Sequence, residues 1–172
     1  MTTFRRLTCV VACCCLFAVQ ACSASDEEAN FQLALHQTRV IAHQHEAEFQ
    51  SVAIALMQSP IEWADREVVR LRSPNGESMP SNWRSSSVDQ TTALLAKALF
   101  GKFDVVAIHV SKQRVSFGLA ANGLAPSGTA IGILVDRNGN AGCDVVGKIE
   151  HLQFRGFQCE KINQTSYFYV QR

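Results

Sequence analysis

The stretch that decides the fold is residues 103–136, which read FDVVAIHVSKQRVSFGLAANGLAPSGTAIGILVD. It holds the densest run of β-branched and aromatic residues in the chain, and these residue types favour strands. Two breaks divide it: the polar residues 111–114, which have hairpin length, and the loop 122–128, which contains two glycines and Pro126. The stretch therefore predicts three consecutive strands.

The alternation of side chains predicts how each of these strands is buried. In residues 103–110 both alternating sets are mostly apolar, which predicts a strand buried on both faces. In residues 115–121 only one set is bulky, so one face is expected to be buried. Residues 129–135 form the third strand, in which Gly132 lies opposite the isoleucines and indicates a bulge or a close backbone approach.

Length and composition favour one packed domain. The chain has 172 residues, of which 47% are hydrophobic and 18% charged, a composition typical of a globular core. Its formal charge is +1, and removal of a leader that contains Arg5 and Arg6 leaves 14 basic against 15 acidic residues. This near-neutral balance gives no electrostatic footprint for a nucleic acid, so no nucleic-acid partner is expected.

The first 24 residues have the three parts of an export signal. Arg5 and Arg6 form a positive start, an apolar run follows over residues 7–19, and small residues precede a cleavage point. The run ends in Val-Gln-Ala-Cys, which resembles the lipobox of bacterial lipoproteins. This resemblance implies cleavage after Ala21 and lipid attachment, with palmitate among the acyl chains, at Cys22.

The leader also sets the expected organisation and location. Residues 1–21 are predicted to be a lipoprotein signal peptide, residues 22–28 a tether and residues 29–172 a single α+β domain. Ser23 after the cysteine, where an aspartate is absent, resembles lipoproteins delivered to an outer membrane. We therefore expect a lipid-anchored protein on the periplasmic face of that membrane; the alternative is plain secretion without lipid.

The cysteines support an oxidising compartment. Of seven cysteines, five lie at or before Cys22, which leaves Cys143 and Cys159 as a pair. In an exported domain such a pair predicts a disulfide, worth about 3 kcal/mol for a loop of this size. Two separate thiols, or a metal site that uses both, are the alternatives, but the chain has no Cys-x-x-Cys and no nearby histidine cluster.

A long helix is predicted after the tether. Ser25 and the acidic residues after it match a helix start, and apolar residues recur at steps of three and four until Pro60 closes the pattern. Several potential metal ligands lie on this helix, but their spacing points them in different directions, so no metal site is expected. These residues are His36, His43, His45, Glu46 and Glu48.

Two further helices are predicted before residue 103. Residues 59–62 match a capping box with proline at the first helical position, which predicts a helix toward Val69. Residues 68–71 could instead form a short edge strand. Ser87 is expected to cap the third helix, which Gly101 would end.

The tail adds two expected strands, at residues 150–154 and 166–171, the second with Tyr167 and Tyr169 on one face. Residues 136–140 contain Asn-Gly, a strong hairpin signal, and resemble a calcium loop that lacks its turn glycine and its terminal glutamate. Altogether the chain predicts an α+β fold, with N-terminal helices packed on an antiparallel sheet of four or five strands.

The C-terminal part also resembles a loosely defined set of small exported bacterial proteins. The resemblance rests on the Gly-Leu-x-x-Ser-Gly motif at residues 123–128, the glycine-bearing strand after it, and the aromatic run Tyr-Phe-Tyr-Val at residues 167–170. It implies the fold and the export, and no activity comes with it.

The sequence contains no catalytic signature. Ser127 lies on a glycine-flanked loop, but there is no Gly-x-Ser-x-Gly elbow, and the sequence alone cannot connect His109 or His151 to this serine. No cofactor motif is present, so no cofactor is expected. We therefore expect a non-enzymatic envelope lipoprotein that binds another protein, of the kind that neutralises a toxin in the periplasm.

The expected contact surface consists of two loops, because loops on rigid scaffolds carry recognition. The residues assigned to it are Trp83, Asn122, Leu124, Pro126 and Ser127. The rival hypothesis is a small-ligand binder or hydrolytic envelope enzyme with a pocket between helix and sheet. Such a pocket would use His109, Ser127 or Tyr169. The third hypothesis is a purely structural lipoprotein.

Overall fold

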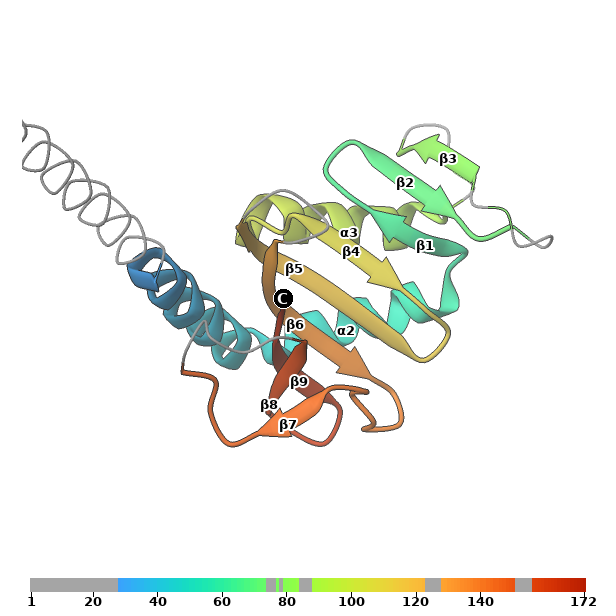
Figure 1. Cartoon of the computed structure of the whole chain (residues 1–172). Helices are drawn as coiled ribbons and strands as arrows, with labels where there is room; N and C mark the ends of the chain where they lie inside the picture. Colours follow the sequence, from blue (N-terminus) through green and yellow to red (C-terminus); the bar gives the residue numbers. More distant parts are fainter. Residues whose placement is uncertain (1–27, 74–76, 78, 84–87, 123–127, 151–155) are drawn as a thin grey trace, which may run out of the picture.

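The structure is a computed structural model of the chain (Figure 1), and it describes residues 28–73, 77, 79–83, 88–122, 128–150 and 156–172. The expected signal peptide, Cys22 and the tether up to residue 27 lie outside these residues. In the described part of the chain, no helix is both long enough and apolar enough to cross a bilayer.

Three helices and nine strands make up the described fold, so the expected α+β class is confirmed and the expected number of strands is wrong. The helices are residues 28–44, α2 (Glu46–Gln58) and α3 (Gln90–Phe103). The strands are β1 (Ile61–Ala64), β2 (Val68–Leu71), β3 (Met79–Asn82), β4 (Ala107–Val110), β5 (Arg114–Asn122), β6 (Thr129–Asp136), β7 (Asp144–Val146), β8 (Phe157–Lys161) and β9 (Ser166–Gln171).

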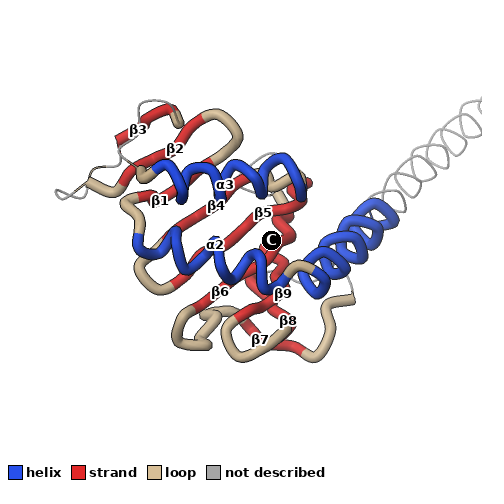
Figure 2. Tube along the Cα trace, turned by 180° about the vertical axis from the view of Figure 1, so that it is seen from behind, coloured by secondary structure: helices blue, strands red, loops and turns tan. Residues whose placement is uncertain are grey.

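All nine strands belong to one sheet, in the order β3-β2-β1-β4-β5-β6-β9-β8-β7. Neighbours are antiparallel except β7 and β8, which are parallel. Figure 2 shows α2 and α3 lying across one face of the sheet, and Figure 1 shows the opposite face, on which none of the described helices lies. We call this second face the open face.

The core fills the space between the sheet and the helices. Phe49, Val52 and Leu56 of α2 are buried against residues that alternate along the central strands. The helix of residues 28–44 joins the same core, and Arg39 of that helix forms an ion pair of 2.6 Å with the largely buried Glu160 of β8. This pair fixes the first helix to the C-terminal half of the sheet.

Residues 103–136, which were expected to decide the fold, do form its centre, with two corrections. β5 and β6 lie where they were predicted, but β4 starts at Ala107 because Phe103 belongs to α3. The expectation that this strand is buried on both faces is wrong: Ile108 and Val110 are buried, whereas His109 is exposed. The reason is that no described helix covers the second face.

Gly132 marks a close backbone approach, as expected. A Cβ atom added there would lie 2.0 Å from the carbonyl oxygen of Phe117 and 2.8 Å from Cε1 of Tyr169. The irregularity in register lies on the neighbouring strand, between Gly118 and Ala120 of β5. Only glycine fits at position 132 without moving the adjacent strand.

The long first helix is interrupted. His45 lies at a bend between residues 28–44 and α2, and its imidazole ring packs against the Phe103 ring with centroids 4.7 Å apart. α3 begins after Asp89, whose side chain accepts the backbone N–H of Thr92, and the expected cap Ser87 lies outside the described residues. α3 also continues past Gly101 to Phe103, which is buried in the core.

The predicted second helix is wrong, because residues 61–71 form the hairpin of β1 and β2. The Ser59 hydroxyl donates to the Leu56 carbonyl and accepts the Ile61 N–H, so this serine ends α2 instead of starting a helix. The Asp65 carboxylate accepts the backbone N–H groups of Glu67 and Val68 and closes the turn. The alternative prediction of a strand at residues 68–71 is confirmed by β2. The edge strand of the sheet, however, is β3, which lies in a region that was expected to be a loop.

The C-terminal part confirms two predictions and adds two strands. β9 is present with Tyr167 and Tyr169 on one face, and the Cα atoms of Cys143 and Cys159 lie 5.9 Å apart in a disulfide. The disulfide joins the segment before β7 to β8. Neither β7 nor β8 was predicted, and the expected strand at residues 150–154 falls almost entirely outside the described residues.

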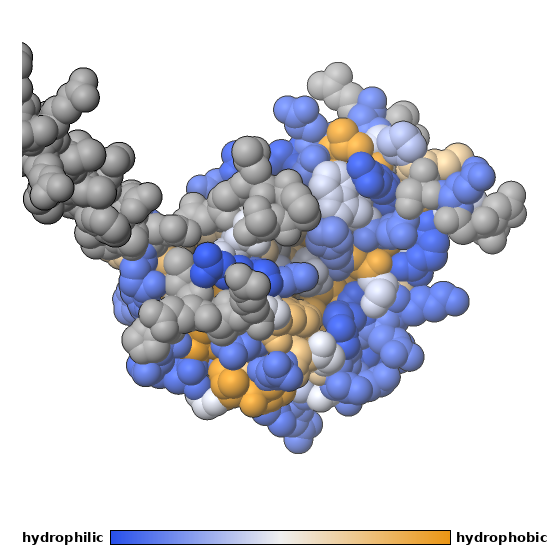
Figure 3. Space-filling model, in the orientation of Figure 1, coloured by the Kyte–Doolittle hydropathy of each residue, from blue (hydrophilic) through white to orange (hydrophobic). Residues whose placement is uncertain are grey.

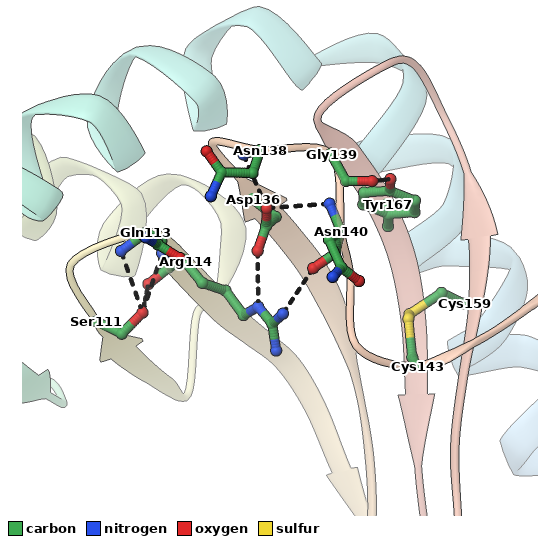
Figure 4. A network of polar contacts seen from close by, with 10 residues as sticks. All are labelled: Ser111, Gln113, Arg114, Asp136, Asn138, Gly139, Asn140, Cys143, Cys159 and Tyr167. Carbon is green, nitrogen blue, oxygen red and sulfur yellow. Dashed lines mark hydrogen bonds and ion pairs between the residues drawn. A yellow bond between two sulfur atoms is a disulfide. The ribbon is translucent and has the colours of Figure 1, made fainter.

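The turn after β6 is held by side chains (Figure 4). The Asp136 carboxylate accepts the backbone N–H groups of Asn138 and Asn140 and the Nε–H of Arg114. Gly139 has φ of 69°, and its carbonyl accepts the Tyr167 hydroxyl at 2.6 Å. The Asp136 carboxylate, which resembled the start of a calcium loop in the sequence, therefore holds a tight turn.

Candidate functional site

A row of polar and aromatic side chains crosses the open face. The strand register pairs Arg70 of β2 with Trp63 of β1, Trp63 with His109 of β4, and His109 with Ser116 of β5. Directly paired residues project from the same face of a sheet, and their neighbours in each strand, such as Ile108, point into the core. We call these four residues the open-face row.

The rings of the open-face row are in contact. The Arg70 guanidinium carbon lies 5.0 Å from the centroid of the Trp63 ring, and the Trp63 and His109 ring centroids are 6.3 Å apart at an angle of 70°. A guanidinium at this distance over an indole gains about 0.5 to 1 kcal/mol at an exposed site. Arg70 forms an ion pair with no carboxylate among the described residues.

A trough of small residues lies beside the row. The next paired positions are Ala107 of β4, Gly118 of β5 and Gly132 of β6, and Tyr169 of β9 is paired with Gly132. The Tyr169 ring lies across Gly132, and its hydroxyl comes within 3.9 Å of the position that a Cβ would take at Gly118. The two glycines thus provide the space that the phenol occupies.

His109 and Ser116 of the row and Ala107, Gly118 and Tyr169 of the trough line a groove of about 330 Å³. Figure 3 shows hydrophilic and hydrophobic residues interspersed over the visible part of this face, with an apolar cluster near its lower edge. The lining residues are Val106, Ala107, His109, Arg114, Ser116, Gly118, Ala120, Ala130, Leu134, Phe157, Tyr169 and Gln171.

Tyr169 is the buried polar group of the groove. Its side chain is 6% exposed and packs edge-on against the Phe157 ring at 5.6 Å. Burial raises the pKa of Tyr169 to about 12, and a side-chain hydrogen bond with Ser116 partly opposes this rise. The phenol is therefore protonated at neutral pH and acts as a neutral hydrogen-bonding group.

His109 is neutral at the same pH. Partial burial lowers the pKa of His109 below its usual value of 6.5, and the positive charge of Arg70 lowers it further. A neutral imidazole offers one donor and one acceptor nitrogen to a bound group. The groove therefore combines a neutral histidine and a neutral tyrosine, and the exposed Arg70 lies outside it at the far end of the open-face row.

Arg114 is one of the residues that line the groove. Its Nε–H donates to the buried Asp136 at 3.1 Å and its terminal nitrogen donates to the Asn140 carbonyl at 2.7 Å (Figure 4). These bonds hold the guanidinium in place and balance its charge. Arg114 is thus part of the scaffold of the groove, whereas Arg70 is not tied to a carboxylate.

Two of the residues proposed from the sequence meet in this groove. His109 and Tyr169 both line it, but it lies on the open face, not between helix and sheet. A separate cavity of about 300 Å³ does lie beside α2, and its lining contains no histidine, tyrosine or serine. The lining residues of that cavity are Gln50, Ile54, Met57, Gln58, Val135, Arg137 and Thr165.

The residues of the expected contact surface are spread apart. Trp83 is partly buried after β3, where its ring packs against Phe100 and its Nε1–H donates to the Asp65 carbonyl at 3.4 Å. Asn122 ends β5, which three strands separate from β3. Leu124, Pro126 and Ser127 lie outside the described residues.

Arg70, Trp63 and Ser116 were not singled out from the sequence. Their strands are brought together only by the register, across segments far apart in the chain. The glycines in the middle of β5 and β6 were the available signal, because a glycine within a strand often marks close approach of another group. Comparison with protein-family models, curated proteins and solved structures found no match. The evidence for this site is therefore the geometry of the open face alone.

Proposed function

We propose that the protein is a non-enzymatic cell-envelope lipoprotein that binds another protein through the open-face row, of the kind that neutralises a toxin in the periplasm. The single observation that carries this proposal is the stack of Arg70 on Trp63 on a sheet face without a described helix. Tryptophan and arginine contribute most often to the binding energy of protein interfaces.

The scaffold supports this role. Each residue of the row is part of a strand, so its position is fixed before binding and little conformational entropy is lost on association. The disulfide between Cys143 and Cys159 agrees with an oxidising compartment, and the export signal of the sequence supports the envelope.

A capture experiment tests this proposal. The full chain, expressed with its own leader and a C-terminal affinity tag, would be recovered from envelope extracts and its partners identified by mass spectrometry. We expect one protein near stoichiometry, lost with Trp63→Ala and retained with Trp83→Phe. Equal capture by both variants would contradict the surface, and no partner above background would contradict the function.

Folding of the variants needs its own control, because Trp63 is partly buried. Arg70→Gln changes an exposed residue and loses only its contact with the Trp63 ring, so the melting temperature should fall by no more than a few degrees. A partner that is lost with Arg70→Gln, while the melting temperature stays within this range, would assign the loss to binding and not to unfolding.

The second candidate is a small-ligand binder or hydrolytic enzyme. The observation that favours it is that His109, Ser116 and Tyr169 converge on one groove, with His109 directly paired to Ser116. A neutral imidazole beside a hydroxyl can accept a proton. Turnover of ester or amide substrates that disappears in His109→Ala and Ser116→Ala would support this candidate over the first.

A further inference from the structure

Charge is distributed unevenly on the open face. Among the described strand residues, the register places the cations Arg70, Arg114 and Lys161 on this face. The carboxylate that it places there is Asp136, which is 4% exposed and bonded to Arg114. Glu62 occupies the bulge of β1, where it has no partner in the register and is engaged in another contact. The accessible charge that the register assigns to this face, on Arg70 and Lys161, is therefore positive.

Arg70 is exposed and forms no ion pair with a described carboxylate, so its N–H donors can reach a bound anion. A guanidinium presents these donors in its own plane, in a fork that matches a carboxylate. The stack on Trp63 also restrains the side chain, so less rotamer entropy is lost when an anion binds. Arg70 is thus a positioned cation without a carboxylate partner in the described chain.

We infer that the open face recognises a carboxylate-bearing segment of the partner protein, with the carboxylate on Arg70 and a neighbouring apolar side chain in the trough beside Tyr169. This inference rests on the proposed protein-binding function. The groove of about 330 Å³, which Ala107 and Gly118 line beside the Tyr169 ring, has room for an aliphatic side chain next to the row.

The position of the two tryptophans provides a direct readout. The chain contains only Trp63 and Trp83, so the full-length Trp83→Phe variant has a single indole, and that indole lies in the row. The probes are the acetylated peptide Gly-Glu-Leu-Glu-Leu-Gly and its counterpart with glutamine in place of both glutamates. Trp63 fluorescence would be titrated with each peptide.

We expect saturable binding of the glutamate peptide and at least about tenfold weaker binding of the glutamine peptide, since one charge-assisted contact is lost. Arg70→Gln should weaken the glutamate peptide by a similar factor, and added salt should weaken it further. Lys148→Gln is the matched control: it removes an exposed cation, paired with Glu150, in the segment between β7 and β8, and should change nothing.

Three results would overturn the inference: no fluorescence change with the glutamate peptide, equal binding of the two peptides, or an unchanged affinity in Arg70→Gln. These results differ from a failure of the proposed function. A protein partner captured equally well by Arg70→Gln would keep the function and contradict the acidic segment. Peptide binding without any captured protein would support the acidic recognition and contradict the function.

Discussion

The two faces of the sheet use the same strands for different purposes. On the covered face β5 carries Val115 and Phe117, which are fully buried against the helices, and on the open face it carries Ser116 and Gly118. Adjacent residues of one strand therefore belong to the core and to the groove in turn, because the side-chain period of a strand is two. Substitutions on the covered face should change stability, and substitutions on the open face should change binding.

The largest expected effect is the difference in stability between alanine substitutions at two adjacent residues of β5, one on each face. Phe117→Ala removes a fully buried ring and is expected to lower the free energy of unfolding by about 3 to 5 kcal/mol. Ser116→Ala removes one hydrogen bond with Tyr169 and should lower it by about 1 kcal/mol. Denaturant unfolding of both variants measures the difference, and equal losses would contradict the assignment of the two faces.

The next prediction concerns the close approach at Gly132. Gly132→Ala places a Cβ atom 2.0 Å from the Phe117 carbonyl oxygen, so the strands must separate, and we expect a loss of about 3 kcal/mol. Gly101→Ala is the matched control, because nothing lies within 4 Å of its added Cβ in α3, and it should stabilise by up to about 1 kcal/mol. Melting curves of the two alanine variants should therefore shift in opposite directions.

Because burial raises the pKa of Tyr169, we expect the protein to lose stability at alkaline pH. Its pKa is about 12 in the folded protein and about 10 when unfolded, so the protonated phenol stabilises the fold. This contribution is complete below pH 10 and is lost as the pH rises from 10 to 12, by about 2 to 3 kcal/mol in total. Tyr169→Phe should remove this part of the pH dependence.

The titration itself can be observed, because the chain has only two tyrosines. In Tyr167→Phe the phenolate absorbance reports Tyr169 alone. A midpoint near pH 10 in that variant would show that the Tyr169 hydroxyl is open to solvent and would contradict the buried position in the trough.

The smallest expected effect is that of His109 at acidic pH. The pKa of His109 is lowered in the folded protein, so the unfolded chain binds its proton first as the pH falls below 6.5. Stability should decrease on acidification in that range and stay constant above it. The decrease should be absent in His109→Gln, and in Trp83→Phe the Trp63 fluorescence should report the protonation of its neighbour with a midpoint below 6.5.

The fold could be predicted from the sequence where a periodic pattern extends over a whole element. The alternation in residues 115–121 and 129–135 predicted β5 and β6 to within one residue at each end, and the count of cysteines predicted the pair of Cys143 and Cys159. Prediction failed at residues 59–71, because the serine and proline that resemble a helix start instead follow the end of α2. β3 and β7 were not predicted, because short and exposed edge strands show little alternation of apolar and polar side chains.

The candidate site was less accessible to sequence reasoning. His109 and Tyr169 were named as isolated residues, but their meeting depends on the register of β4, β5, β6 and β9. The stack of Arg70 on Trp63 depends on the bulge between Ile61 and Trp63, which shifts the pairing of β1 with β2. A bulge that moves a side chain to the other face leaves no signal in the hydrophobic pattern.

The measurement that tests the central claim most directly is acrylamide quenching of Trp63 in the full-length Trp83→Phe variant, with and without the captured partner protein. If the open-face row is the binding surface, the partner covers Trp63 and the quenching constant falls on complex formation. A quenching constant that stays the same while the partner is bound would show that the partner lies elsewhere and would contradict the account.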